Sequence, residues 1–228
     1  MTSTEINQLF ILPKEPEILF EDFYLAILIK PFGFTVEKHL HYPSIEGFFL
    51  THLQSAFPER KNHFIGIVHR IDLLTGGIVV VAKTPQALKQ LNKQFEEKKA
   101  VKKYIALLEG KFIANNNTIK GFITEDKKNR KAYFSEEELP ESKSCALEIE
   151  NHFPSNENSY VHINLLTGRF HQIRATFTYF GHPVVNDEKY GAKKISEENK
   201  IFLVANSLEI RHPKTNEQLF FQIKKAFD

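Results

Sequence analysis

Residues 69–77 read His69-Arg70-Ile71-Asp72-Leu73-Leu74-Thr75-Gly76-Gly77, and they run directly into the apolar segment Ile-Val-Val-Val-Ala at 78–82. A run of β-branched residues bounded by glycines is typical of a buried strand. An Asp on the preceding turn usually accepts backbone N–H bonds. A carboxylate at the mouth of a rigid core strand is also well placed for catalysis, so Asp72 is a candidate for both roles.

A second block, residues 167–174, reads Thr-Gly-Arg-Phe-His-Gln-Ile-Arg. Apolar residues continue from it at helical spacing and Gly181 marks a stop, which predicts a helix from Phe170 to Phe180. Arg174 lies at the border of the apolar stripe, so its stem can be buried while its guanidinium reaches an interior anion. We expect Arg174 to hold the Asp72 carboxylate in its ionised form.

Composition indicates an ordinary globular protein. Of the 228 residues, 42% are hydrophobic and 25% are charged, which is enough apolar material for a substantial core and excludes dominant disorder. The single cysteine, Cys145, permits no internal disulfide and no cysteine-based metal cage, so we expect it to pack in the core of a protein from a reducing compartment. Without a signal-like N-terminus, a long apolar stretch or a coiled-coil pattern, the sequence predicts a soluble cytoplasmic monomer with no membrane contact.

The pattern of apolar residues and turn signals predicts an α+β fold, with a mixed, mostly antiparallel β-sheet core flanked by a few helices. One helix is expected from Ser44 to Phe57, and another begins after the N-cap Thr84. The middle of the chain, residues 111–160, is polar and predicts strands on a solvated edge. The expected strands are 17–21, 25–29, 78–82, 101–108, 201–205 and 218–223, with 144–153 and 159–166 pairing as a hairpin.

The formal charge of +2 does not by itself indicate a nucleic-acid partner, but basic residues cluster locally. One cluster is Lys98, Lys99, Lys102 and Lys103, and the other is Lys127, Lys128, Arg130 and Lys131. Each cluster is either a basic face for a polyanion or ordinary solvated charge.

The order and spacing of these motifs resemble the RluA family of pseudouridine synthases. The likeness rests on the two blocks above, on Lys103-Tyr104, and on later motifs that extend it nearly to the C-terminus: Gly181-His182-Pro183, Asp187-Glu188-Lys189-Tyr190-Gly191 and Arg211-His212-Pro213. The resemblance implies the pseudouridine synthase catalytic fold as a single domain over residues 1–228, without the small RNA-binding S4 domain found in many relatives. It also implies isomerisation of uridine in structured RNA, either tRNA or rRNA, with no cofactor and no metal.

The resemblance also implies roles for individual residues. Asp72 would be the essential carboxylate, Arg174 its ion-pair partner and Tyr104 the aromatic beneath the uracil. Arg70 would fill the space that the extruded base leaves in the RNA. The RNA-binding set would be His69, Arg70, Lys103, Arg169, His171 and Gln172.

Three positions depart from the family pattern. Gly76 stands where the family usually has Ser, Phe170 where it has Thr, and Val204 where it has His. None of these departures removes a residue expected to touch the chemistry. Gly76 borders the turn that presents Asp72, so we expect it to loosen that turn.

Other function classes fit less well. The string His-Arg-x-Asp is similar to a kinase catalytic loop, but its Asp is one residue late and no phosphate loop accompanies it. His39-x-His41 is the nearest approach to a metal-ligand pair, and no further ligand set supports it. A non-catalytic RNA-binding protein derived from the same fold is the remaining alternative.

Overall fold

The protein divides into two compact units in a computed structural model that describes residues 10–114, 116–155 and 157–223. Unit 1 comprises Met1–Val101 and Ala205–Asp228, and unit 2 comprises Lys102–Val204. The described residues form eleven β-strands, three α-helices and one 3₁₀ helix, as the predicted α+β class requires. Among these residues no helix is both long enough and apolar enough to span a membrane.

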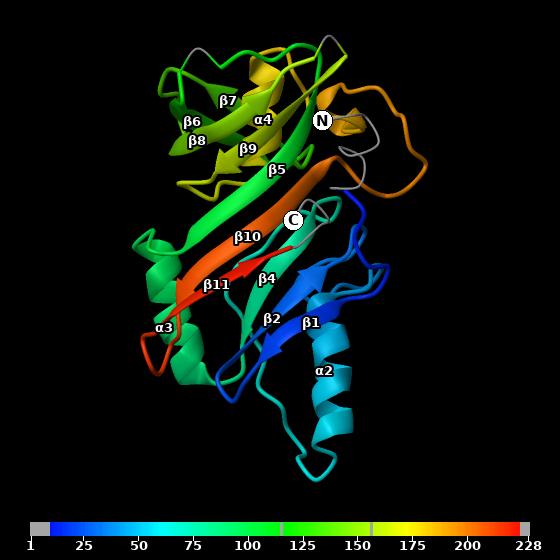
Figure 1. The fold of residues 1–228 in the computed structure, drawn as a ribbon, viewed down its shortest axis with the longest axis vertical. Helices are drawn as coiled ribbons and strands as arrows, with labels where there is room; N and C mark the ends of the chain where they lie inside the picture. Colours follow the sequence, from blue (N-terminus) through cyan, green and yellow to red (C-terminus); the bar gives the residue numbers. More distant parts are fainter. Residues whose placement is uncertain (1–9, 115, 156, 224–228) are drawn as a thin grey trace. The chain divides into compact units, whose positions relative to one another are not determined.

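Unit 1 is built on a sheet with the strand order β1-β2-β4-β10, and these strands are labelled in Figure 1. Off this path, β11 pairs with β10 and β3 pairs with β4. The pairings of β1 with β2, β2 with β4, and β10 with β11 are antiparallel. The strands are β1 (Glu17–Glu21), β2 (Leu25–Lys30), β3 (Gly66–Ile67), β4 (Gly76–Ala82), β10 (Leu203–Arg211) and β11 (Gln218–Gln222).

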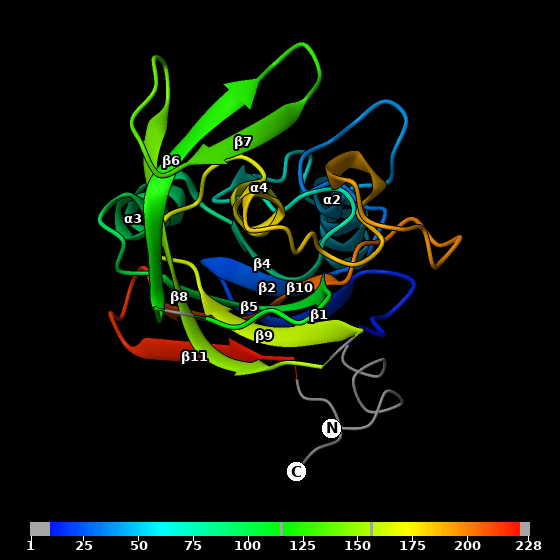
Figure 2. The ribbon, with the colours of Figure 1, turned by 90° about the horizontal axis from the view of Figure 1, so that it is seen from above.

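Helices α2 (Ile45–Ala56) and α3 (Pro85–Glu96) lie on the same face of this sheet (Figure 2). Both begin at side-chain caps, since the hydroxyls of Ser44 and Thr84 accept hydrogen bonds from the third residue beyond them. All seven residues of β4 are buried, and those facing α3 pack against Leu91. The β4 strand is therefore a rigid element in the core of unit 1.

Unit 2 contains an antiparallel sheet with the order β5-β9-β8-β6-β7. Helix α4 (Gln172–Tyr179) packs beside β7, and its Ala175 joins a buried cluster with Phe134, Cys145 and Tyr190. The 3₁₀ helix η1 spans Glu188–Tyr190. The strands are β5 (Val101–Glu109), β6 (Thr118–Asp126), β7 (Lys131–Ser135), β8 (Lys143–Phe153) and β9 (Asn158–Asn164).

Most predicted elements are confirmed with bounds shifted by one or two residues, and two of the differences have an identifiable cause. The predicted helix at 170–180 begins only at Gln172, because His171 has φ 49° and cannot belong to a right-handed helix. The strand predicted at 201–205 is β10, which starts at Leu203 and continues to Arg211. Polar residues at Asn206 and Ser207 interrupt the apolar pattern, but pairing with β11 extends the strand past them.

Candidate active site

Asp72 opens a tight turn that delivers the chain into β4. Its carbonyl oxygen accepts a hydrogen bond from the Thr75 amide at 3.0 Å, and the strand begins at the next residue. Asp72 itself is half-buried. The predicted arrangement, a carboxylate on a turn at the mouth of a core strand, is confirmed.

Lys30 stabilises this turn through a hydrogen bond to its backbone. The Leu73 carbonyl accepts hydrogen bonds from the Gly33 amide at 2.9 Å and from Lys30 Nζ at 3.4 Å. Lys30 is fully buried, and its Nζ also donates to the carbonyls of Phe34 and Pro31. Burial lowers the pKa of Lys30 to about 7, opposed by the negative charge of Asp72. Lys30 was not among the predicted site residues, because the end of an apolar strand is an unusual place for a buried amine.

The two glycines after the turn allow neighbouring atoms to pack closely against the backbone. Gly77 has φ +126°, and a Cβ there would lie 2.3 Å from the Ala205 carbonyl oxygen on β10. A Cβ at Gly76 would lie 2.1 Å from Leu12 Cδ1, so the Leu12 side chain occupies the space that a serine would need. The expectation that Gly76 loosens the Asp72 turn stays a prediction.

His69 and Arg70 precede the turn but differ in exposure. The His69 ring stacks on Phe95 at 4.8 Å between centroids, and its Nε2 accepts a hydrogen bond from the Val80 amide. Arg70 is exposed and donates from Nη1 to Glu37 at 2.8 Å. Arg70 is thus accessible to a ligand, whereas His69 packs between α3 and β4.

In unit 2, Lys103 and Tyr104 lie in β5 beside Asn164 and Ile163 of β9. Tyr104 is buried, with 7% of its surface exposed. Lys103 Nζ forms an ion pair with Glu150 at 2.6 Å. Burial lowers the pKa of its neighbour Lys102.

Arg174 lies on α4 with 3% of its surface exposed, and a bidentate ion pair joins it to Asp187. Its Nε donates to Asp187 Oδ2 at 2.7 Å and its Nη2 to Oδ1 at 2.9 Å. The prediction of a buried stem with a guanidinium that reaches an interior anion is confirmed. Asp187 was not among the anions predicted for Arg174, although the motif at 187–191 contains it. The pairing of Arg174 with Asp72 stays a prediction.

The predicted RNA-binding residues at the start of α4 have different environments. Arg169 is partly exposed and its Nε donates to the Ser144 carbonyl. His171 stacks on Phe170 and its Nδ1 lies 3.0 Å from the Tyr190 hydroxyl. Gln172 is 3% exposed, and its amide bonds to Thr167, Arg169 and Ala146. Such a side chain stabilises the turn from inside, and the RNA-binding role of Gln172 stays a prediction.

Acidic neighbours partly neutralise the first of the two basic clusters. Lys99 pairs with Glu97 at 2.6 Å, as Lys103 does with Glu150. In the second cluster, Lys131 lies 5.0 Å from the Tyr190 ring centroid, while residues 127–130 are exposed at the β6–β7 turn. Exposed charge at that turn is compatible with RNA binding and with plain solvation.

Neither the cysteine nor the histidine pair forms a metal site. Cys145 is buried, and burial raises its pKa to about 11, consistent with the predicted packing role. His39 and His41 are exposed, with ring centroids 5.9 Å apart. Over the described ranges, no three His, Cys, Asp or Glu side chains gather closely enough to hold a metal ion.

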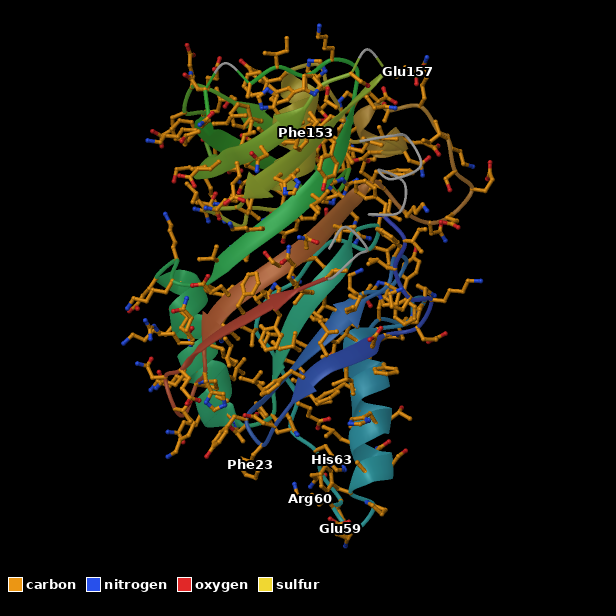
Figure 3. All side chains as sticks on the ribbon, in the orientation of Figure 1. Phe23, Glu59, Arg60, His63, Phe153 and Glu157 are labelled. Atoms are coloured by element: carbon orange, nitrogen blue, oxygen red, sulfur yellow. The ribbon has the colours of Figure 1, made fainter. Side chains whose placement is uncertain are left out.

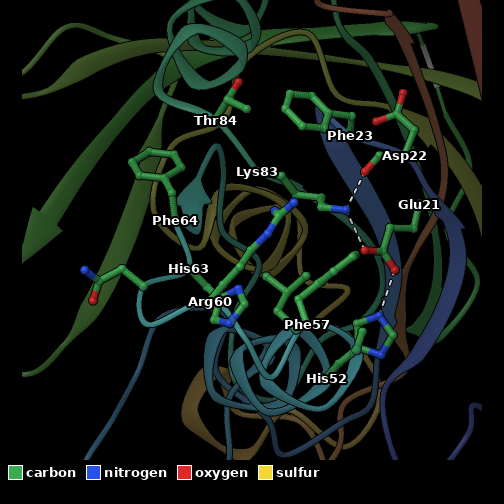
Figure 4. A pocket seen from close by; sticks show the side chains of 13 residues that line it. Glu21, Asp22, Phe23, His52, Phe57, Arg60, His63, Phe64, Lys83 and Thr84 are labelled. Carbon is green, nitrogen blue, oxygen red and sulfur yellow. Dashed lines mark hydrogen bonds and ion pairs between the residues drawn. The ribbon is translucent and has the colours of Figure 1, made fainter.

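A cavity of about 710 Å³ lies at the other end of β4, and Phe23, Arg60 and His63 are among its lining residues (Figure 3). Inside it, Lys83 donates to Glu21, which also bonds to His52 (Figure 4). Burial raises the pKa of Glu21, but these partners outweigh it and lower the pKa overall. The seven residues of β4 separate this cavity from the Asp72 turn by about 23 Å. The cavity is therefore distinct from the Asp72 site.

Comparison with known proteins identifies the family. A sequence profile described as RNA pseudouridylate synthase matches residues 24–179. Ribosomal large subunit pseudouridine synthase C of Haemophilus ducreyi is 34% identical over 227 residues, which cover 96% of this chain and 68% of that protein. The protein of the same name from Escherichia coli K12 is 32% identical over 213 residues, covering 88% of this chain and 63% of the relative. The chain thus spans about two thirds of the length of these relatives.

Solved structures show the same fold. Human RNA pseudouridylate synthase domain containing 4 superposes with a TM-score of 0.73 at 20% identity, covering 92% of this chain and 88% of that one. Human RNA pseudouridylate synthase domain containing 1 superposes with a TM-score of 0.70 at 22% identity, covering 95% and 87%. Together with the motifs that carry Asp72 and Arg174, these matches confirm the predicted fold and enzyme class: the chain belongs to the RNA pseudouridylate synthase family.

Proposed function

We propose that this chain converts specific uridines of structured RNA to pseudouridine, with Asp72 as the essential carboxylate. The observation that carries the proposal is the position of Asp72 on a turn tied to Lys30 and Gly33, at the entrance to the fully buried strand β4. A carboxylate anchored in this way loses little entropy when it meets a substrate. Membership of the family supplies the reaction class.

The reaction needs few chemical groups from the protein. The N1–C1′ bond breaks, a C5–C1′ bond forms, C5 loses a proton and N1 gains one, so the isomerisation balances without a co-reactant. An ionised carboxylate near C1′ serves nucleophilic attack, proton abstraction or stabilisation of positive charge on the sugar. Arg174 is the proposed partner that keeps Asp72 ionised, and Tyr104 the proposed wall against which the detached uracil turns.

The RNA substrate must be opened before the uridine can react, at a cost of a few kcal/mol. Arg70 is exposed and can replace the extruded base by stacking its guanidinium plane on the neighbouring bases. Lys103 and Arg169 are the proposed backbone contacts, with His69, His171 and Gln172 shaping the surface around them. The names of the relatives favour large-subunit ribosomal RNA over tRNA as the target. The cytoplasmic, monomeric state stays a prediction.

The test compares wild-type protein with Asp72→Asn on unmodified ribosomal RNA and tRNA transcripts carrying tritium at uridine C5. Wild type should release tritium from one class of transcript, and Asp72→Asn should release none while binding the RNA with an unchanged Kd. Turnover by Asp72→Asn would exclude the role of Asp72. RNA binding without tritium release by the wild type on either class would favour the non-catalytic alternative.

A further inference from the structure

The cavity at the far end of β4 is a second concave site in unit 1, and the proposed function assigns it no role. Its volume of about 710 Å³ is ample for a small ligand or a single nucleotide. Two exposed phenylalanines, Phe23 and Phe64, line it together with charged side chains (Figure 4). Ring faces that are open to solvent inside a cavity are available for stacking.

The acidic side chains of this cavity are already satisfied by other residues. Glu21 accepts a hydrogen bond from Lys83 Nζ at 2.6 Å, and its second oxygen lies 2.8 Å from His52 Nε2. Both oxygens of the Asp22 carboxylate are also hydrogen-bonded, one to two backbone amides and the other to His212. The acidic wall therefore offers little attraction to a cationic ligand.

The opposite wall is the segment 57–64, which links α2 to β3 and presents Arg60. The Arg60 amide donates to the Phe57 carbonyl at 3.1 Å, and its guanidinium carbon lies 4.7 Å from the Phe57 ring centroid. The ion pair with Glu59 is 3.8 Å long and exposed, so it contributes little. The Arg60 guanidinium is thus positioned over a ring and accessible to an anion.

His63 supplies a further polar atom in the same segment. Its Nε2 is shielded from solvent and bonds to none of the residues that the structure describes. Shielded polar atoms in proteins nearly always have a hydrogen-bond partner, because an unpaired one is costly. A ligand with a polar group within reach of Nε2 would supply that partner.

These features match the chemistry of an unpaired nucleotide. Bases that are not paired stack on phenylalanine rings and bond to polar side chains through their edges. Arginine beside an aromatic ring binds the phosphate that accompanies each base. Because Glu21 and Asp22 are neutralised by their partners, the accessible charge of Arg60 is complementary to a polyanion.

We propose that this cavity binds an unpaired nucleotide of the RNA substrate, outside the region that meets Asp72. The inference rests on the proposed function, since it takes RNA as the ligand of this chain. The cavity and the Asp72 turn lie in the same unit, about 23 Å apart along β4. At about 3.4 Å per stacked nucleotide, this separation corresponds to about seven nucleotides.

The experiment compares the Kd of two RNAs in a filter assay at one fixed salt concentration. One is a short hairpin of ribosomal RNA sequence with a four-nucleotide loop, and the other is the same hairpin with about ten unpaired uridines added at each end. The extension should tighten binding to wild type about tenfold. Arg60→Gln and Phe64→Ala should each lose most of this gain and should bind the short hairpin within about twofold of wild type.

Lys89→Gln and Phe220→Ala are the matched controls. Lys89 is an exposed cation on α3, Phe220 is an exposed phenylalanine on β11, and neither lines the cavity. Both variants should keep the gain from the extension. The imidazole NMR signal of His63 provides a direct readout, and it should shift when a ten-nucleotide oligouridylate is added to wild type.

Three results would overturn the inference: an extension that does not tighten binding to wild type, a gain that Arg60→Gln and Phe64→Ala both retain, or equal losses on the two RNAs. An unchanged His63 signal would also overturn it, because the cavity would then belong to a peptide or a small metabolite. Tritium release by wild type together with any of these results removes the inference alone. Loss of the gain in Arg60→Gln and Phe64→Ala without tritium release by wild type removes the proposed catalysis and leaves the binding site in place.

Discussion

Lys30, which binds the Asp72 turn, should make the free energy of unfolding depend on pH, and Lys30→Met should remove that contribution. The amine is fully buried among the carbonyls of Pro31, Phe34 and Leu73. Burial lowers its pKa from 10.5 to about 7, with the charge of Asp72 opposing the shift. Between these two pH values the unfolded chain binds a proton that the folded protein lacks.

The sign and size follow from proton linkage. Because the folded state disfavours the protonated amine, stability contributed by Lys30 is greatest above pH 10.5, falls as the pH drops, and reaches its minimum below pH 7. The slope approaches about 1.4 kcal/mol per pH unit inside the window. From pH 7 to pH 9 the free energy of unfolding should therefore rise by about 2 kcal/mol through Lys30 alone.

Urea unfolding of wild type, Lys30→Met and Lys89→Met at pH 7, 8 and 9 measures this effect. Lys89 is exposed on α3 and provides the same chemical change without burial. The difference in unfolding free energy between wild type and Lys30→Met should change by about 2 kcal/mol over this range, in favour of wild type at high pH. The unfolding free energies of wild type and Lys89→Met should change with pH by the same amount. If the unfolding free energies of Lys30→Met and wild type showed the same pH dependence, the lowered pKa of Lys30 would be refuted.

Three further predictions concern Gly77 in β4, the exposed Arg70–Glu37 pair and the salt dependence of RNA binding. Gly77→Ala should lower the free energy of unfolding by at least about 3 kcal/mol, because its Cβ would meet the Ala205 backbone. Gly191→Ala, at φ +91°, places its Cβ in open space and should lower this free energy by only about 1 kcal/mol. Urea unfolding measures both values, and equal losses would contradict the packing explanation. Glu37→Ala should change the free energy of unfolding by less than about 1 kcal/mol, because the Arg70–Glu37 ion pair is exposed. The same substitution releases Arg70 and should tighten RNA binding several-fold at low salt. Weaker binding in a filter assay would count against Arg70 as an RNA contact. RNA affinity should fall at least tenfold between about 50 and 200 mM salt, and a flat titration would argue against phosphate contacts.

Local sequence patterns were sufficient to predict those helices and strands that depend on contacts between neighbouring residues. The β-branched run after Gly77 predicts β4, the helical spacing of apolar residues predicts α2, and the cap Thr84 predicts the start of α3, because each depends on contacts within a few residues. The motif spacing also indicated the family, which the profile match confirms.

Tertiary structure alone decided the environments of the functional side chains. Arg174 predicts an interior anion, but only the fold brings Asp187 to it, 13 residues away. Lys30 becomes a buried amine because the chain folds its end of β2 beneath Leu73, 43 residues further on. Gln172 is buried, and its side-chain amide bonds to Thr167, Arg169 and the carbonyl of Ala146, which lies 26 residues away in the sequence. The periodicity of apolar residues predicts which face of an element is buried. The contacts that a side chain makes with distant segments depend on how the whole unit packs.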